Sequence, residues 1–204
     1  MFHVKHDGMG SAAAAWGVAI PEDRAGSLLE FETLLTDRGI SLGLVARSDR
    51  DRIRERHILD SLRAAPAVRP RDRVAVDIGS GGGLPGIVIA IACPDLRVVL
   101  AERRRNRVAF LELAVEHLHL GNVQVAPGPV EALDLTADLA FARAFSDLRT
   151  SWMAATGVLA PGGRLVYFAG AGSGDRVPPE GVRMEILAPP PVASAGPLVI
   201  MSQQ

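Results

Sequence analysis

Lysine, cysteine and tyrosine are almost absent from this sequence of 204 residues, which contains one of each. The single cysteine, Cys93, excludes an internal disulfide framework and a metal site built from several cysteines, and we interpret it as a packing residue. Every apolar run ends at glycine, proline or charge well before the roughly 18 residues that a membrane span needs. The first ten residues also lack the apolar core of a signal peptide. These absences predict a cytoplasmic protein with no membrane segment and no metal.

Positive charge comes almost entirely from arginine. The formal net charge is −1, so the chain has no overall basic field that would attract nucleic acid. Arginine nevertheless presents a planar fork that suits phosphate, and arginines cluster at 47–56, 69–73 and 103–107. The clusters predict local contacts with phosphate, and an ordinary solvated surface is the alternative interpretation of each one.

Hydrophobic periodicity divides the chain into three parts. Residues 1–22 read as a loose arm, and residues 23–68 as a helical cap with helices at 28–39 and 49–66. Residues 69–204 read as one domain, because strands and helices alternate over 73–168 as in a parallel sheet. The expected strands are 73–79, 97–101, 123–126, 138–142, 164–169, 182–188 and 197–202, and the expected helices are 86–92, 104–118 and 148–158. No helix is expected between the last two strands, so they predict an antiparallel hairpin at one edge.

A glycine-rich loop, VDIGSGGGLPG (76–86), follows the first strand of this domain and opens a helix. Backbone amides and a helix N-terminus converge on a ligand at such a junction. The glycines fit two patterns. Gly81, Gly83 and Gly86 match the G-x-G-x-x-G fingerprint of dinucleotide-binding folds. Asp77, Gly79, Gly81 and Gly83 match the acid-x-G-x-G-x-G pattern of S-adenosylmethionine (SAM) methyltransferases.

Three features favour SAM over NAD. An acid, Asp77, precedes the first glycine, where dinucleotide folds usually have an apolar residue. The turn PGG (161–163) precedes the fifth strand, and the sheet is expected to end in a hairpin. Both patterns require an acid at the end of the second strand to bind ribose hydroxyls, and Glu102 stands there without deciding between them. A glycine turn that binds nothing is the remaining alternative.

Several motifs together resemble the bacterial 16S ribosomal RNA (guanine-N7) methyltransferase G family, also called glucose-inhibited division protein B. They are RHILDSL (56–62), VDIGSGGGLPGIVIAI (76–91), RVAFLELAVEHL (107–118), VE (130–131) and RAF (143–145). The resemblance implies a Rossmann-like, seven-stranded α/β fold with a small N-terminal helical cap. It also implies SAM as methyl donor and N7 of one guanine in 16S rRNA as acceptor, within the small ribosomal subunit or its precursor. We expect a monomer.

The resemblance, the glycine loop with Glu102, and the arginine clusters together give two sets of expected site residues. Those expected to bind SAM are Asp77, Gly79, Gly81, Gly83, Leu84, Glu102, Val130, Glu131 and Arg143. Those expected to contact RNA are Arg56, His57, Arg104, Arg105 and Arg107. Arg143 is a candidate positioning residue, and an ion pair with an acid such as Asp77 is its alternative. For His57 the alternative is a packed, hydrogen-bonded histidine. No general base is named, because guanine N7 carries a lone pair and no proton at neutral pH.

The sequence departs from the family pattern mainly where RNA would bind. Residues 36–49 lack the usual Trp-Asn and Asn-Leu-Thr, Asn106 replaces a basic residue, and Ala169 replaces a lysine. The loop 170–181 replaces an acidic helix. These departures leave two alternatives open besides rRNA methylation. One is a methyltransferase acting on another RNA or a small molecule, and the other is a non-catalytic SAM-binding protein that associates with ribosomes.

The opening hexapeptide MFHVKH fits no helix cap, strand or signal. Permitted codons allow it to be written as a DNA palindrome similar to the centromere-like site of chromosome partitioning. The hypothesis is that DNA-level selection set these residues, and it predicts that the first ten residues are disordered and dispensable. The gene's first six codons test it.

Overall fold

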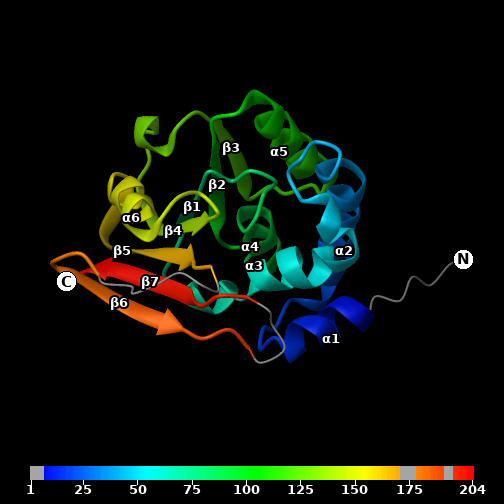
Figure 1. The fold of residues 1–204 in the computed structure, drawn as a ribbon, viewed down its shortest axis with the longest axis horizontal. Coiled ribbons are helices and arrows are strands. Elements are labelled where there is room, and N and C mark those ends of the chain that lie inside the picture. The colour runs from blue at the N-terminus through cyan, green and yellow to red at the C-terminus, as the bar shows by residue number, and fades with distance from the viewer. Residues whose placement is uncertain (1–6, 171–177, 191–194) are drawn as a thin grey trace, which may run out of the picture.

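The computed structural model describes residues 7–170, 178–190 and 195–204. Residues 1–6 and 171–177 lie outside that part, and with them MFHVKH and most of the loop 170–181. The described residues form a seven-stranded sheet with helices on both faces (Figure 1). The predicted α/β class and strand number are therefore confirmed.

The sheet has the strand order β3-β2-β1-β4-β5-β7-β6. The strands are β1 (Val74–Ile78), β2 (Arg97–Glu102), β3 (Val123–Pro127), β4 (Ala137–Arg143), β5 (Leu159–Phe168), β6 (Val182–Leu187) and β7 (Leu198–Gln203). Strands β1 to β5 run parallel, and β7 pairs antiparallel with both β5 and β6. The predicted edge hairpin is confirmed. Because the order reverses between β1 and β4, their carboxyl ends flank a crevice where open α/β sheets bind ligands.

The helices are α1 (Asp7–Ala15), α2 (Ala25–Leu34), α3 (Asp60–Leu62), α4 (Gly86–Ala92), α5 (Arg105–His117) and α6 (Leu148–Thr156). Alternate residues of a strand face opposite sides of the sheet. In β1, Ala75 joins the core cluster of α2, α4 and α5, whereas Val76 and Ile78 join the cluster of α6. The cap and the sheet therefore share one hydrophobic core. The boundary at residue 68 stays a prediction about domain organisation.

The N-terminal segment differs from the expected loose arm over residues 1–22. Residues Asp7–Ala15 form α1, and Met9, Ala13 and Val18 are buried in the core shared with α2. The segment ends in a Schellman motif, in which Val18 N donates to Ala13 O and Gly17 N donates to Ala14 O. Gly17 takes the required positive φ of 75°. Residues 7–10 are thus helical, contrary to the expectation of disorder.

Two further elements differ from the prediction. The helix expected over 49–66 is split into a 3-10 helix at Arg47–Arg52, a π-helix at Arg54–Leu59, the short α3 and a 3-10 turn at Ala65–Ala67. The fifth strand begins at Leu159 rather than 164, so the PGG turn lies inside β5. The pairing with β4 shifts register between Ala137 and Leu139, which accommodates this turn as an irregularity of the ladder.

Candidate functional site

A hollow of about 680 Å³ lies at the carboxyl ends of β1, β2 and β4, at the switch point of the sheet. Four of the residues predicted to bind SAM line it, namely Gly79, Glu102, Val130 and Glu131. Arg104 and Arg107, predicted to contact RNA, line it as well. Sequence reasoning did not assign Phe145, although RAF (143–145) was among the motifs that carried the resemblance.

Glu102 holds the glycine loop in place through hydrogen bonds to backbone amides. Its Oε2 accepts from Gly81 N at 2.9 Å, and its Oε1 accepts from Arg104 N at 2.9 Å. The guanidinium of Arg107 lies 3.7 Å from Oε2. Each carboxylate oxygen can accept a second hydrogen bond. Glu102 can therefore hold the loop and still accept from a pair of hydroxyl groups in the hollow.

Gly79 must be glycine for two reasons. Its φ is +70°, and a Cβ at this position would lie 2.6 Å from Cδ2 of Phe145. The ring of Phe145 thus lies against the backbone of the loop, and both residues line the hollow. This close approach makes one wall of the hollow from bare peptide and a flat aromatic ring.

Asp77 is buried at the end of β1, next to the hollow but not in its lining. Its Oδ2 accepts from Gly86 N at 3.0 Å, whereas its Oδ1 is buried without a partner in the described part of the chain. Burial raises the pKa of this carboxyl to about 7, opposed by the Gly86 amide and by the charge of Arg143. A cationic group brought near Oδ1 would restore the charged form.

Arg143, at the end of β4, ties the sheet to the cap. Its Nη2 lies 3.1 Å from Asp60 Oδ2, 2.7 Å from Arg56 O and 3.4 Å from His57 Nδ1. Its guanidinium carbon also lies 5.8 Å from the centre of the Phe168 ring. The alternative considered from the sequence, an ion pair with a nearby acid, is what the structure has, with Asp60 as the acid in place of Asp77, the example given. Burial lowers the pKa of Arg143, and the charge of Asp60 opposes this.

His57 is a half-buried, hydrogen-bonded histidine. Its Nε2 lies 3.1 Å from Asp49 Oδ2, and Asp49 also pairs with Arg56 at 3.2 Å. Burial lowers the pKa of His57, and the nearby Arg143 lowers it further. The geometry matches the alternative in which this histidine packs and positions its neighbours.

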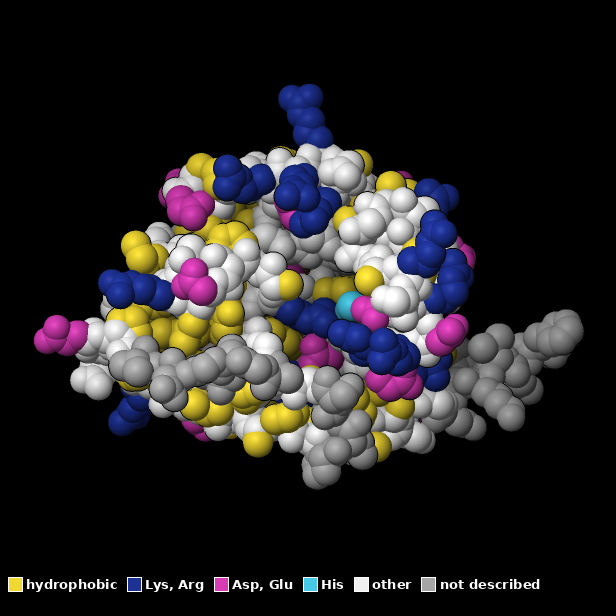
Figure 2. Space-filling view, viewed as in Figure 1, with side chains coloured by type: hydrophobic (Ala, Val, Ile, Leu, Met, Phe, Trp, Pro, Cys, Tyr) yellow, Lys and Arg dark blue, Asp and Glu magenta, His cyan; other side chains and the backbone are white. Residues whose placement is uncertain are grey.

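Arg143 and His57 line a second hollow, of about 520 Å³. Its walls also include Trp16, Asp60, Arg63 and Phe168. Figure 2 shows arginine, histidine and acidic side chains gathered around a depression in the middle of this face. Two hollows therefore meet the carboxyl edge of the sheet, one lined by the glycine loop and the other by the cap.

The chain is similar in sequence to known proteins over most of its length. The pattern of the family described as "rRNA small subunit methyltransferase G" (GidB) matches residues 24–185. The chain belongs to this family. It is 41% identical over 162 residues to the Ribosomal RNA small subunit methyltransferase G of Clavibacter sepedonicus, covering 78% of this chain and 74% of that one. It is 36% identical over 187 residues to the protein of that name from Burkholderia thailandensis, covering 87% and 81%.

Solved structures confirm the fold of this methyltransferase G family member. The Mitomycin 7-O-methyltransferase MmcR has a TM-score of 0.59 at 16% identity, covering 90% of this chain and 67% of that one. The structure of MtNAS in complex with MTA and tNA has a TM-score of 0.60 at 15% identity, covering 98% and 75%. At these identities the likeness concerns the fold alone.

The remaining predicted residues lie around the two hollows. Gly81 contributes its amide to Glu102, and Gly83 packs on α4, where a Cβ would meet Ile87. Leu84 is buried in the core, and Arg105 is exposed at the start of α5. The glycine loop is thus shaped and anchored by four predicted residues that line neither hollow, Asp77, Gly81, Gly83 and Leu84.

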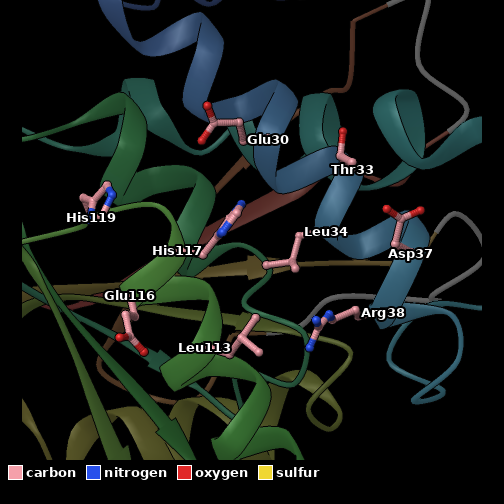
Figure 3. Close-up of a pocket in the computed structure, with 9 residues that line it drawn as sticks. All are labelled: Glu30, Thr33, Leu34, Asp37, Arg38, Leu113, Glu116, His117 and His119. Carbon is pink, nitrogen blue, oxygen red and sulfur yellow. The ribbon is translucent and has the colours of Figure 1, made fainter.

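A third hollow, of about 660 Å³, lies between α2 and α5 (Figure 3). Leu34 and Leu113 form its apolar part, and Glu30, Glu116 and His117 surround them. His117 ends α5, and a helix following a parallel strand runs back toward the amino edge of the sheet. This hollow is therefore remote from the carboxyl edge.

Among the described residues of this family member, no helix has the length and hydropathy of a membrane span.

Proposed function

We propose that this protein transfers a methyl group from SAM to N7 of a guanine in 16S rRNA, in the cytoplasm and as a monomer. Membership of the methyltransferase G family supports the activity. The hollow lined by Gly79 of the glycine loop and by Glu102 supports the cofactor site. The names of the relatives support small-subunit rRNA as the acceptor, and we propose that it is methylated within the small ribosomal subunit or its precursor.

The residues of the first hollow fit the adenosine part of SAM. Glu102 is buried at the end of β2 with spare acceptor capacity for the ribose hydroxyls. Val130 and Glu131, in the turn after β3, would border the adenine, and the bare backbone at Gly79 permits close approach. Asp77 fits the methionine end, because its unpartnered Oδ1 would gain a partner in the ammonium group.

The chemistry requires alignment more than proton transfer. SAM supplies an electrophilic methyl group on its sulfonium, which the lone pair of guanine N7 can attack directly. Arg143 is held by Asp60 and by a backbone carbonyl, so its charge is fixed in the second hollow, at the end of β4. A fixed charge of this kind can orient the methionine carboxylate or an RNA phosphate without reorganisation during the reaction.

Labelled SAM and small subunits from a strain lacking this methylation test the proposal. We expect label at a single guanine, mapped by cleavage at 7-methylguanosine, and SAM binding by calorimetry. SAM binding with label on another RNA or small molecule would support a retargeted enzyme. Binding without any turnover would support a non-catalytic ribosome-associated protein, and no SAM binding would contradict every version of the proposal.

A further inference from the structure

The second hollow contains two aromatic side chains, which differ in what surrounds them. Phe168 is buried, and the guanidinium carbons of Arg63 and Arg143 lie 6.0 and 5.8 Å from its ring centre. Trp16 is half-buried and packs with one part against the core of the cap. Phe168 is thus engaged by two cations of the protein, whereas Trp16 keeps accessible surface in the hollow.

Trp16 is held in place by the end of α1. It is the last residue before Gly17, and its amide donates to Ala13 O at 3.0 Å. The Schellman bonds from Gly17 and Val18 close the helix around it, and Val18 is anchored in the core. Three hydrogen bonds, from the amides of Trp16, Gly17 and Val18, therefore fix the backbone that carries the indole. The flat side chain needs little further ordering to accept a planar ligand.

The polar groups of the hollow suit a guanine base. An enzyme that modifies a base takes it out of the stack, holds it on aromatic side chains and reads its Watson–Crick edge. That edge of guanine offers N–H donors, and the hollow has acids at its rim, Asp51 and Glu55. The opposite edge carries N7, which must stay free for the methyl group. A base stacked on the indole with its Watson–Crick edge toward these acids would leave N7 free on its opposite edge.

We propose that Trp16 is the stacking residue for the target guanine, so that α1 belongs to the substrate site. The inference rests on the proposed function for the identity of the base. The observation that carries it is an accessible indole, fixed by the end of α1, in one hollow with Arg143 and His57 at the carboxyl edge of the sheet.

Trp16→Ala and Trp16→Phe test the kinetic consequence. Stacking of one base on an aromatic side chain predicts a fall of about 5- to 100-fold in kcat/KM for small subunits in Trp16→Ala. Trp16→Phe retains a ring and should stay within about threefold of the parent protein. Affinity for SAM should be unchanged in both. The matched control is Ile20→Ala, which removes another half-buried side chain of the same segment that lines neither hollow at the carboxyl edge.

Tryptophan fluorescence tests the contact without methylation. Besides Trp16, the chain has only Trp152, which is buried in α6. We expect GMP to quench the parent protein and to leave Trp16→Phe, which retains Trp152, unquenched. Equal quenching of both proteins, or none in either, would overturn the proposal, and so would full kcat/KM in Trp16→Ala. If GMP quenches Trp16 but subunits are not methylated, the proposed rRNA activity fails while the stacking site stands.

Discussion

Arg143 contacts the cap through a single nitrogen, Nη2. A lysine at this position would keep the charge but would lose the planar guanidinium, whose carbon lies 5.8 Å from the centre of the Phe168 ring while Nη2 contacts Asp60. We expect Arg143→Lys to lower kcat/KM by about tenfold or more through misplacement, and the free energy of unfolding by about 1–3 kcal/mol. Methylation assays and urea unfolding measure both. Arg183→Lys, at an exposed arginine of β6, is the control and should match the parent protein.

Asp77 predicts a specific pH dependence of stability in the ligand-free protein. Its folded pKa of about 7 lies above the ordinary value of 3.8, so the folded state retains a proton that the unfolded state releases. The contribution of Asp77 is therefore most favourable below about pH 4 and is lost as pH rises to about 7. Three pKa units correspond to about 4 kcal/mol.

The comparison with Asp77→Asn isolates this effect, because asparagine cannot titrate. The free energy of unfolding of the parent minus that of the variant should fall by about 4 kcal/mol between pH 4 and pH 7 and then level off. Urea unfolding at successive pH values measures it. A difference that stays constant with pH would show that Asp77 is ionised throughout.

Local spacing explains which site residues the sequence could predict. Asp77, Gly79 and Glu102 belong to two adjacent strands and the loop between them, so the motif alone places them together. The partner of Arg143 could not be predicted in this way, because Asp60 lies in the cap, and only the tertiary fold brings it to the end of β4.

At the scale of elements, α1 is the main difference from the sequence prediction. Its signals were present, since Met9 and Ala13 are four residues apart and Gly17 stands at the helix end. The alanines and glycines between them bury little area each and give a weak periodicity, so the segment reads as an arm. The strands and the helices after residue 73 were predictable because long apolar residues make their period clear.

The packing of α1 predicts opposite effects at neighbouring positions. Met9 is fully buried, so Met9→Ala should lower the free energy of unfolding by about 2–5 kcal/mol. Gly10 lies in the same helix, and a Cβ there would meet nothing within 4 Å. Gly10→Ala should therefore raise stability by about 0.5–1 kcal/mol. Thermal or urea unfolding distinguishes them, and a neutral Met9→Ala would mean that α1 is not part of the folded core.

At the scale of the whole molecule, one buried ion pair fastens the end of the cap to the middle of the sheet. Arg164 of β5 lies 2.6 Å from Asp72 Oδ2 and also donates to Ala67 O at 3.0 Å. Asp72→Ala would leave a buried, uncompensated guanidinium and should cost about 3–5 kcal/mol. The double variant Asp72→Leu with Arg164→Met removes both charges and should recover much of that loss in urea unfolding. Equal losses in both variants would contradict this interpretation of the pair.

The distribution of charge over the molecule predicts how RNA association responds to salt. The net charge is −1, so attraction to phosphate must come from local clusters such as Arg103–Arg107 rather than from the whole surface. Arg104 and Arg105 are exposed at the start of α5, beside the first hollow. Replacing both by glutamine should reduce the slope of log affinity against log salt concentration by about 0.7–0.9 for each phosphate that the variant no longer neutralises.

Small subunits titrated at several salt concentrations measure this slope. Arg183→Gln is the matched control, because Arg183 is equally exposed but lies on β6, the edge strand opposite β3. If the slope changes with the Arg104 and Arg105 pair alone, RNA approaches the molecule over the start of α5. If Arg183→Gln changes it as much, attraction is spread over the surface, and the arginines near the hollow have no special part in it.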